Sequence, residues 1–419
     1  MGRDSSGKRM DAPGSGNADV NLAVRLGNLL LSNPFVVGSG PTVRDLAQIV
    51  RAEDSGWAGA SLKLAIEPEP YISLPPRYRW LRRERLHTFT AEKRLTPAQS
   101  LRLLEEARRR TRRIALLANI TYDGADAEGW ARMARRFQEA GAHALELNMC
   151  CPNMSYNVEQ TGGATAKATG ASLGADLRRL EEVVERVTAA VRTPVIAKLT
   201  PEGGRVAEAA EVCLRAGAAA VGSTGNRLGI ADFDIRAPWP GIYRLQKEMT
   251  LGCLSGSWVR PLALRDTYEI RLRSGPNPFV FGAGGVSDLG SAVRQIMAGA
   301  DALWVCTETM LRGFEWLPEL LEELRSYMRE MGFSRLTDFR DRLLASMASA
   351  QELTVHPGHA EVDPERCTAC GLCWQLGHCP AVSHPDDVTR IDADLCLGCS
   401  TCVDVCPRGA IHMVTENSS

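Results

Sequence analysis

The sequence lacks a large net charge, a long apolar run and an export signal. Its 49 Lys and Arg residues nearly balance its 50 Asp and Glu residues, so the net charge attracts neither nucleic acid nor an anionic membrane. No stretch of about 18 apolar residues is present, and residues 1–20 are polar and rich in Gly and Ser, unlike a signal peptide. We therefore expect a cytoplasmic protein that binds neither nucleic acid nor membrane, with residues 1–20 as a disordered tail.

A dinucleotide-binding fingerprint is also missing. The Gly-rich segments Gly38–Gly40 and Gly282–Gly285 do not complete Gly-x-Gly-x-x-Gly with an acidic residue at the usual distance. Each segment fits a tight turn between a strand and a helix, or a turn that contacts a phosphate or a flavin. The sequence therefore offers no dedicated site for a pyridine nucleotide.

Residues 21–335 predict an α/β fold, a (β/α)8 TIM barrel. Short β-branched or apolar runs alternate there with longer segments of helical period, the pattern of a parallel sheet. The expected strands are Phe35–Val37, Ala60–Leu62, Ile114–Ala118, Ala144–Leu147, Val195–Leu199, Ala219–Ser223, Phe279–Gly282 and Ala302–Val305. Eight strands close a barrel. Residues 336–359 are expected to form a linker and a last helix.

Cysteine is concentrated at the other end of the chain. Of 13 cysteines, 8 lie within the 40 residues from Cys367 to Cys406, and an odd total without an export signal argues for metal or cluster ligation rather than disulfides. They form two copies of the bacterial ferredoxin signature, Cys367-x2-Cys370-x2-Cys373 with Cys379-Pro380, and Cys396-x2-Cys399-x2-Cys402-x3-Cys406-Pro407. Residues 360–419 are therefore expected to form a small α+β ferredoxin-like domain.

The signature also predicts which thiolates share a cluster, because its fourth Cys ligates the cluster of the other copy. One [4Fe–4S] cluster is expected on Cys367, Cys370, Cys373 and Cys406, and the other on Cys396, Cys399, Cys402 and Cys379. The first copy departs from the pattern, since five residues rather than three (Trp374–His378) precede its fourth Cys. Two zinc sites, each with four cysteine ligands, are the alternative, which the paired copies with Cys-Pro ends disfavour. Two such clusters would transfer electrons one at a time.

Further motifs stand out in the barrel region. They are Glu146–Asn153 (ELNMCCPN), Ala197–Pro201 (AKLTP), Leu254–Ser257 (LSGS) with Arg260–Pro261, and Gly284–Val286 (GGV). In this order they resemble the FMN barrel of the dihydropyrimidine and dihydroorotate dehydrogenase family. With the ferredoxin-like domain, the layout resembles the pyrimidine-reducing subunits of bacterial NAD-dependent dihydropyrimidine dehydrogenases. The resemblance covers roughly residues 25–330 and 360–413 and implies FMN at the C-terminal mouth of the barrel, a ferredoxin or a separate NAD(P)H-oxidising flavoprotein subunit as electron donor, and a homodimer.

The resemblance also implies roles for individual residues. Flavin contacts are expected from Ser39, Gly40, Lys63, Asn119, Asn148 and Lys198, and the FMN phosphate is expected near Gly256, Gly284, Gly285, Cys306 and Thr307. Cys151 corresponds to the family's general acid or base. A thiol with a reference pKa of about 8.5 is protonated near neutral pH yet ready to donate. The neighbouring Cys150 is expected to be a small buried hydrophobic residue.

The substrate side departs from the family. The pyrimidine-reducing members read the ring amides with an Asn-x-Glu pair and an Asn-Thr pair, where this chain has Leu86-His87-Thr88 and Gly225-Asn226. The remaining candidates for substrate contacts are His87, Thr88, Asn148 and Asn226. The basic segment Arg77–Arg85 favours an exposed helix face, although one or two of its arginines would suit an acidic substrate.

These features predict a flavin- and iron–sulfur-dependent oxidoreductase. Electrons are expected to pass through two [4Fe–4S] clusters to FMN, and a C=C bond conjugated with a carbonyl is reduced or formed in a pyrimidine-like or other small-molecule substrate, with Cys151 moving the proton. The alternatives are a dihydroorotate-type dehydrogenase or a specialised-metabolite ene-reductase. A further alternative, from another class, is a non-catalytic electron-transfer subunit.

Overall fold

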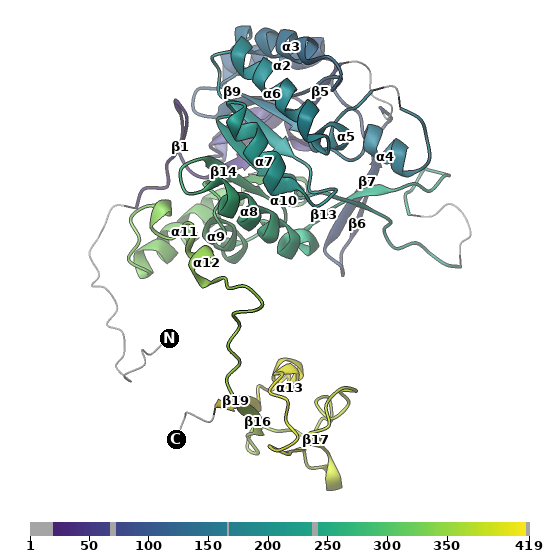
Figure 1. The fold of residues 1–419 in the computed structure, drawn as a ribbon, viewed down its shortest axis with the longest axis vertical. Helices are drawn as coiled ribbons and strands as arrows, with labels where there is room; N and C mark the ends of the chain where they lie inside the picture. The colour runs from purple at the N-terminus through teal and green to yellow at the C-terminus, as the bar shows by residue number, and fades with distance from the viewer. Residues whose placement is uncertain (1–19, 68–72, 166, 237–241, 416–419) are drawn as a thin grey trace. The chain divides into compact units, whose positions relative to one another are not determined.

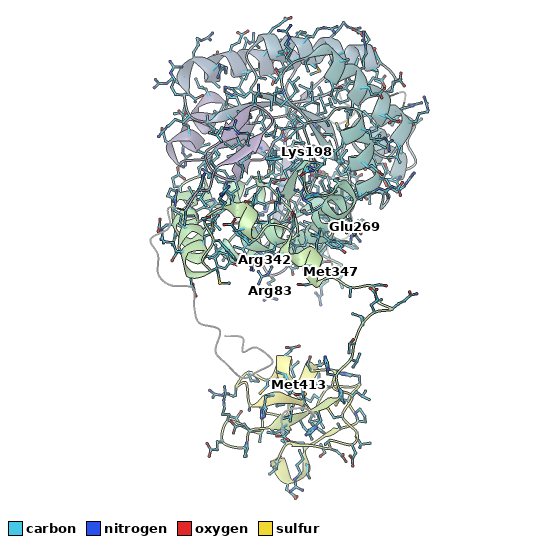
Figure 2. The ribbon with its side chains drawn as sticks, turned by 60° about the vertical axis from the view of Figure 1, so that its left-hand side comes forward. Arg83, Lys198, Glu269, Arg342, Met347 and Met413 are labelled. Atoms are coloured by element: carbon cyan, nitrogen blue, oxygen red, sulfur yellow. The ribbon has the colours of Figure 1, made fainter. Side chains whose placement is uncertain are left out.

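The computed structural model describes residues 20–67, 73–165, 167–236 and 242–415 (Figure 1). The chain forms two compact units, each with its own internal contacts, and the boundary between them lies between Ser346 and Met347 (Figure 2). The tail expected at residues 1–20 lies outside the described residues except for Val20. In the part of the chain that is described, no helix has the length and apolar composition needed to cross a membrane.

The first unit contains a closed barrel of parallel strands. Neighbouring strands follow the order β4-β3-β15-β14-β11-β10-β9-β8, and β8 pairs with β4 to close the ring. The strands are β3 (Phe35–Val37), β4 (Gly59–Ser61), β8 (Ala115–Thr121), β9 (Ala144–Met149), β10 (Val195–Leu199), β11 (Ala220–Ser223), β14 (Phe279–Ala283) and β15 (Ala302–Val305). The predicted (β/α)8 barrel is confirmed, and all eight predicted strands are present with small shifts at their ends.

Helices connect these strands around the outside of the barrel. They are α1 (Leu46–Asp54), α2 (Pro97–Arg110), α3 (Ala127–Glu139), α6 (Leu177–Ala190), α7 (Val206–Arg215), α8 (Arg260–Ser274), α9 (Leu289–Met297) and α11 (Leu317–Glu330). The shorter helices α4 (Ser155–Gln160), α5 (Ala171–Gly174) and α10 (Thr307–Arg312) follow β9 and β15. Five helices begin after an Asp or Thr whose side chain accepts a hydrogen bond from a backbone N–H, which stabilises their first turns.

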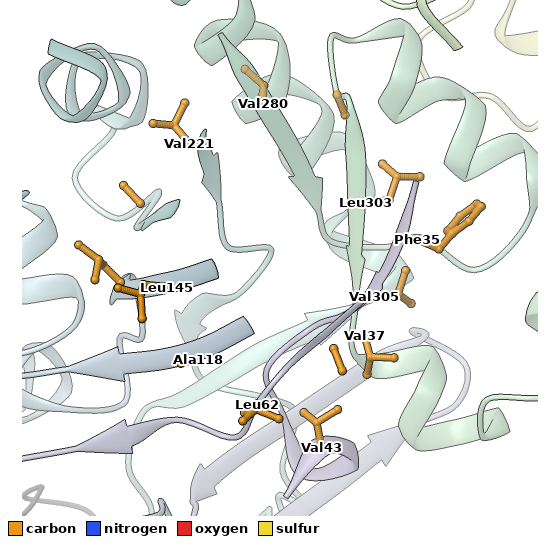
Figure 3. Packing of buried hydrophobic residues seen from close by; sticks show 14 of the residues in the cluster. Phe35, Val37, Val43, Leu62, Ala118, Leu145, Val221, Val280, Leu303 and Val305 are labelled. Carbon is orange, nitrogen blue, oxygen red and sulfur yellow. The ribbon is translucent and has the colours of Figure 1, made fainter. Parts of the chain in front are cut away.

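Along each barrel strand, side chains point alternately to the outside and the inside of the barrel, and together they form two apolar layers and one polar layer. Outward residues such as Phe35 and Leu303, which are direct partners on β3 and β15, pack toward the helices (Figure 3). Inward residues at the start of the strands are apolar, and the hairpin of β1 (Val24–Leu26) and β2 (Leu29–Leu31) adds Leu26 and Leu31 to this inner cluster. Toward the strand ends the inward side chains become polar, as Ala144, Glu146 and Asn148 of β9 show. The polar groups therefore gather at the C-terminal end of the barrel, where active sites of this fold lie.

A second, antiparallel sheet belongs to the same unit, with the order β12-β13-β7-β6 (Figure 1). Its strands are β12 (Arg227–Gly229), β13 (Gly252–Gly256), β7 (Leu86–Ala91) and β6 (Arg77–Leu81). The helix predicted for Arg77–Arg85 is therefore wrong. Its alternation of Arg with Tyr78 and Trp80 has the period of a strand, and pairing with β7 satisfies the backbone.

The barrel unit extends further than the sequence predicted. The 3-10 turn η3 (Leu336–Asp338) and α12 (Arg342–Ser346) follow α11, and Leu336 and Phe339 are buried in the outer core. Part of the expected linker at 336–359 thus packs with the barrel. The second unit begins only at Met347, which Figure 2 labels.

The second unit is small and mixed. The strands β16 (Gly358–Val362) and β19 (Ile411–Thr415) pair antiparallel, as do β17 (Val382–Ser383) and β18 (Arg390–Ile391), and α13 (Thr401–Val405) precedes β19. Its core contains Ala360 and Ile411 beside two of the motif cysteines, Cys373 and Cys402. So little apolar surface is typical of a domain that a bound metal or cluster stabilises.

Candidate active site

A pocket of about 1080 Å³, its open mouth included, lies where the barrel strands end. This size suits a cofactor together with a small substrate. Loops after six barrel strands, Lys198 of β10 and one face of the antiparallel sheet line it. Of the predicted site residues, the pocket lining includes Ser39, Gly40, Lys63, His87, Asn148, Cys151, Lys198, Asn226, Gly256, Gly284, Gly285, Cys306 and Thr307. Asn119 and Thr88 are not among them.

Glycine turns shape one end of this pocket. Gly284 (φ +115°) and Gly285 (φ +75°) follow β14 in a conformation that favours glycine, and a Cβ on Gly285 would lie 2.9 Å from the Cβ of Arg260. A Cβ on Gly40 would collide with the Cys306 Sγ atom. Cys306 and Thr307 follow β15 at the start of the short helix α10. Backbone exposed by such turns after the seventh and eighth strands suits a phosphate, so this end fits the FMN phosphate.

The floor of the pocket rests on a carboxylate inside the barrel. Glu146 is fully buried, and its Oε1 lies 3.3 Å from the Nζ of Lys198 while its Oε2 accepts a 2.5 Å hydrogen bond from the Nε1 of Trp304. Burial alone would lower the pKa of Lys198, but the Glu146 carboxylate outweighs this effect and raises it. Lys198, which Figure 2 labels within the barrel unit, therefore presents a fixed positive charge to the pocket.

Asn119 belongs to the layer behind this floor. Its side chain donates to Glu146 and accepts a 3.1 Å hydrogen bond from the Nδ2 of Asn148. Asn148 lines the pocket, and its Oδ1 accepts from the backbone N–H of Cys151 at 3.1 Å. Asn119 thus orients Asn148 instead of reaching a ligand in the pocket itself.

Two adjacent cysteines of the pocket differ in their surroundings. The Cys151 Sγ lies 3.6 Å from the Nη2 of Arg94. A hydrogen bond from the Cys253 thiol, helped by Arg94 and opposed by burial, lowers the pKa of Cys151. Burial instead raises the pKa of Cys150, whose Sγ lies 3.3 Å from the Oδ1 of Asn148. The ordinary thiol pKa expected for Cys151 is therefore replaced by one that favours the thiolate.

An ion pair lies beside this thiol. The Nζ of Lys63 and the Oε1 of Glu92 are 2.5 Å apart, both are buried, and the Tyr78 hydroxyl donates to the same carboxylate at 3.0 Å. Burial would raise the pKa of Glu92, but the charges of Lys63 and Arg94 outweigh it and lower that pKa. The pair therefore leaves little net charge at this side of the pocket.

The substrate candidates on β7 divide according to the alternation of the strand. His87 and Phe89 line the pocket, whereas the Thr88 hydroxyl lies 2.6 Å from the Tyr243 hydroxyl on the other face. The Thr88 side chain thus lies on the face opposite to His87 and outside the pocket lining, because neighbouring strand residues point to opposite faces. Burial lowers the pKa of His87 to about 4, so its imidazole is neutral near pH 7.

Sequence reasoning assigned no role to several residues that shape the site. They are Tyr78, Phe89, Arg94, Glu146 and Cys253. For Phe89 the usable signal is its spacing of two from His87 on a strand. Arg94 and Cys253 meet Cys151 only through folding, so nothing in their local sequence reveals this. None of the arginines between 77 and 85 lines the described pocket, and Arg77 and Arg79 donate to backbone carbonyls instead.

In the second unit, the folded chain groups the cysteines across the two motifs. A cavity of about 330 Å³ is lined by Cys367, Cys370 and Cys373 of the first copy together with Cys406 of the second. The charges of Cys379, Cys396 and Cys399 act on Cys402, so these four lie near one another. Within the described ranges, no set of three or more His, Cys, Asp or Glu side chains is placed to hold a single metal ion.

The longer spacing of the first copy has a local consequence. The segment between Cys373 and Cys379 forms turns that place the Nε2 of His378 3.4 Å from the Cys399 Sγ atom. Trp374 of the same segment stacks on His384, with ring centroids 6.0 Å apart. The two extra residues are thus accommodated while both groups of four thiols stay together.

Comparisons with known proteins agree with this geometry. The family model "Dihydroorotate dehydrogenase" matches residues 21–328, and the model "4Fe-4S binding domain" matches residues 389–412. The chain is 26% identical over 355 residues to the chloroplastic dihydropyrimidine dehydrogenase (NADP(+)) of Arabidopsis thaliana, covering 80% of each chain. It is 26% identical over 370 residues to the NAD-dependent dihydropyrimidine dehydrogenase subunit PreA of Escherichia coli, covering 84% of each.

A third relative matches the barrel. The catalytic subunit of dihydroorotate dehydrogenase B (NAD(+)) of Thermococcus kodakarensis is 30% identical over 318 residues, which are 76% of this chain and 96% of that protein. The predicted resemblance and the class of oxidoreductase are confirmed by these matches, and a ferredoxin-type 4Fe–4S motif is present. The chain belongs to the dihydroorotate dehydrogenase family.

Proposed function

We propose that this chain transfers a hydride between FMN and a C=C bond conjugated with a carbonyl group, and that Cys151 moves the accompanying proton. The observation that carries the proposal is the Cys151 thiol held beside Arg94 in a pocket that Lys198 and several glycine turns also line. A thiol that only filled space would resemble Cys150, whose pKa is raised by burial.

The residues of the pocket fit FMN and divide its binding between them. The glycine turns after β13 and β14, together with Thr307, are suited to hold the phosphate. Ser39, Gly40, Lys63, Asn148 and Lys198 are left to contact the ring system. FMN, when bound, supplies the hydride chemistry and accepts electrons from the clusters. The positive charge of Lys198 would stabilise negative charge on a ring system held in this part of the pocket.

Cys151 handles the proton in either direction of the reaction. During reduction of the substrate, its S–H donates a proton to one carbon of the double bond while hydride reaches the other. During oxidation, the thiolate accepts that proton. Arg94 and Cys253 stabilise the thiolate, so they favour the base form in the free enzyme and the anion left after donation.

The second unit supplies the electrons in this proposal. Two [4Fe–4S] clusters are held by the two groups of four cysteines, the first by Cys367, Cys370, Cys373 and Cys406 and the second by Cys379, Cys396, Cys399 and Cys402. A ferredoxin or a separate NAD(P)H-oxidising subunit is the donor, since the chain carries no dinucleotide fingerprint and the Escherichia coli relative is itself named as a subunit.

The test is an anaerobic acceptor screen of the photoreduced holoenzyme. Unsaturated pyrimidines, ketones, amides and acids are added one at a time while the flavin absorbance is followed. We expect at least one conjugated acceptor to reoxidise the flavin, and Cys151→Ala to retain FMN but react about 10² to 10⁴ times more slowly.

Cys150→Ala is the matched control, with a smaller effect. The larger loss in Cys150→Ala would contradict the assignment of the proton-transfer group. If every acceptor failed while an artificial oxidant still reoxidised the flavin, the chain would be an electron-transfer subunit without a reaction of its own.

A further inference from the structure

Three rings form one continuous wall of the active-site pocket. Tyr78 on β6 and His87 and Phe89 on β7 all line it, with centroids 5.5 Å apart for Tyr78 and His87, 6.0 Å for Tyr78 and Phe89, and 6.5 Å for His87 and Phe89. We call these three residues the aromatic wall. The rest of the lining mixes glycine turns, polar side chains and separate apolar residues such as Leu64, Val286 and Met310, whereas the wall is a place where three rings adjoin.

Two polar atoms of the aromatic wall, the Tyr78 hydroxyl and the His87 Nδ1, face partners within the protein. The Tyr78 hydroxyl donates to Glu92, which is ion-paired with Lys63. The His87 imidazole is neutral near pH 7, and its Nδ1 faces the Ser255 hydroxyl at 3.5 Å. A ligand therefore meets three rings without a net charge, and a charged group placed on the wall would lose water there without gaining an opposite charge.

The aromatic wall adjoins the group that moves the proton. Phe89 is the direct cross-strand partner of Cys253 on β13, and directly opposite residues of an antiparallel pair point to the same face. The Cys253 thiol in turn contacts the thiol of Cys151. A substrate whose reducible bond lies at Cys151 thus places the neighbouring substituent against Phe89 and the rings beyond it.

We propose that the substrate carries an uncharged planar ring next to its reducible bond, and that this ring packs against the aromatic wall. The inference rests on the proposed function, because it takes Cys151 as the position of the reacting carbon. It assigns Phe89 and His87 as residues that determine specificity. Aromatic rings prefer offset or edge-to-face partners at these separations, so the wall selects flat substituents over compact polar ones.

The test measures binding, which requires no turnover. The oxidised holoenzyme is titrated with two saturated ketones, 4-phenylbutan-2-one and pentan-2-one, while the perturbation of the flavin spectrum is followed. We expect the phenyl compound to bind at least about tenfold more tightly, the gain from burying one phenyl-sized group. Phe89→Ala should reduce this ratio about threefold or more.

Matched variants distinguish an effect of the aromatic wall on binding from a general effect of substitution on the structure. Tyr78→Phe keeps the ring and should keep the ratio, and so should Thr90→Val, whose side chain lies on the same strand but bonds Gln246 outside the pocket. Phe89→Leu keeps an apolar side chain and guards against failed folding, and it should give a ratio between those of the wild type and Phe89→Ala. A wild-type ratio below about two, or equal ratios in Phe89→Ala and Thr90→Val, would overturn the proposal.

Failure of this inference is distinguishable from failure of the proposed function. Cys151→Ala should retain the binding ratio while losing turnover. If the preference for the phenyl ketone is absent while Cys151-dependent reduction is intact, only the role of the aromatic wall is refuted. If the preference is present but no acceptor is reduced, only the proposed reaction is refuted.

Discussion

The sharpest test of the site concerns the Arg94 guanidinium, 3.6 Å from the Cys151 sulfur. Two unit charges at this distance attract by about 1 kcal/mol in water and by about 5 kcal/mol at an effective dielectric constant of 20. The Cys253 hydrogen bond remains when Arg94 is replaced, and the guanidinium charge is delocalised, so we take the lower half of this range. Arg94→Gln should therefore raise the pKa of Cys151 and move its titration midpoint upward by about one to two pH units.

Thiol alkylation reports this midpoint directly. Iodoacetamide reacts with the thiolate, so the alkylation rate of residue 151, followed by peptide mass spectrometry between pH 5 and pH 9, traces the titration. The Cys150→Ala background leaves one thiol in the peptide measured. Arg94→Lys keeps the positive charge and should move the midpoint less than Arg94→Gln, which separates charge from packing.

The reasoning would be refuted by an unchanged or lowered midpoint in an Arg94→Gln variant that still binds FMN. That result would assign the low pKa to Cys253 alone. Arg94 would then serve only as a structural residue, through its 2.9 Å hydrogen bonds to the backbone oxygens of Glu92 and Asn153.

Four further predictions follow from the site and the cluster loops. In the reductive direction kcat/KM should fall as pH rises through the lowered pKa of Cys151, and in the oxidative direction it should rise; profiles of the two directions with parallel slopes would contradict a proton carried by Cys151. Cys406→Ala should alter the electron paramagnetic resonance signal of the cluster shared with Cys367, Cys370 and Cys373 and spare the other signal, whereas the opposite pattern would disprove the crossover. NADH alone should reduce the flavin slowly, and rapid reduction without a partner would show that the barrel mouth accepts nicotinamide. Uracil and thymine should be poor substrates, by about 10² to 10⁴ in kcat/KM, because two missing hydrogen bonds cost about 1 to 3 kcal/mol each; efficient uracil reduction in a steady-state assay would exclude this.

Regular periodicity made the barrel predictable. Each barrel strand buries both faces, and most of the long helices between the strands are amphipathic, so local sequence carries most of the signal, as Val195–Leu199 and the helix after it show. The cysteine motifs were equally predictable, because the short spacing between the cysteines is what ligation of one cluster requires. The strand Arg77–Leu81 was not predicted because its stability comes from pairing with β7. Without knowledge of this pairing, a basic segment with two aromatic residues also fits an exposed helix face.

Within the site, the structure brings to the pocket the predicted residues that end a barrel strand, and it leaves out residues whose placement depends on contacts between distant parts of the chain. Ser39, Lys63 and Lys198 line the pocket because the C-terminal ends of parallel strands meet at one mouth. Asn119 also belongs to such a strand, yet its side chain is hydrogen-bonded to Glu146 and Asn148. Thr88 was chosen without a register for β7, and one step along a strand reverses the face.

The antiparallel sheet decides which of two adjacent cysteines can perform chemistry. Cys150 and Cys151 are chemically identical in the sequence, but the first lies against Asn148 and is held neutral by burial. The second meets Arg94, which follows β7, and Cys253 on β13, so its thiolate is stabilised by groups that are 57 and 102 positions away. The strand β7 also carries His87 and Phe89, which line the pocket. In the proposed function, proton transfer and substrate selection therefore both depend on this antiparallel sheet, while the barrel strands carry the residues proposed to hold FMN.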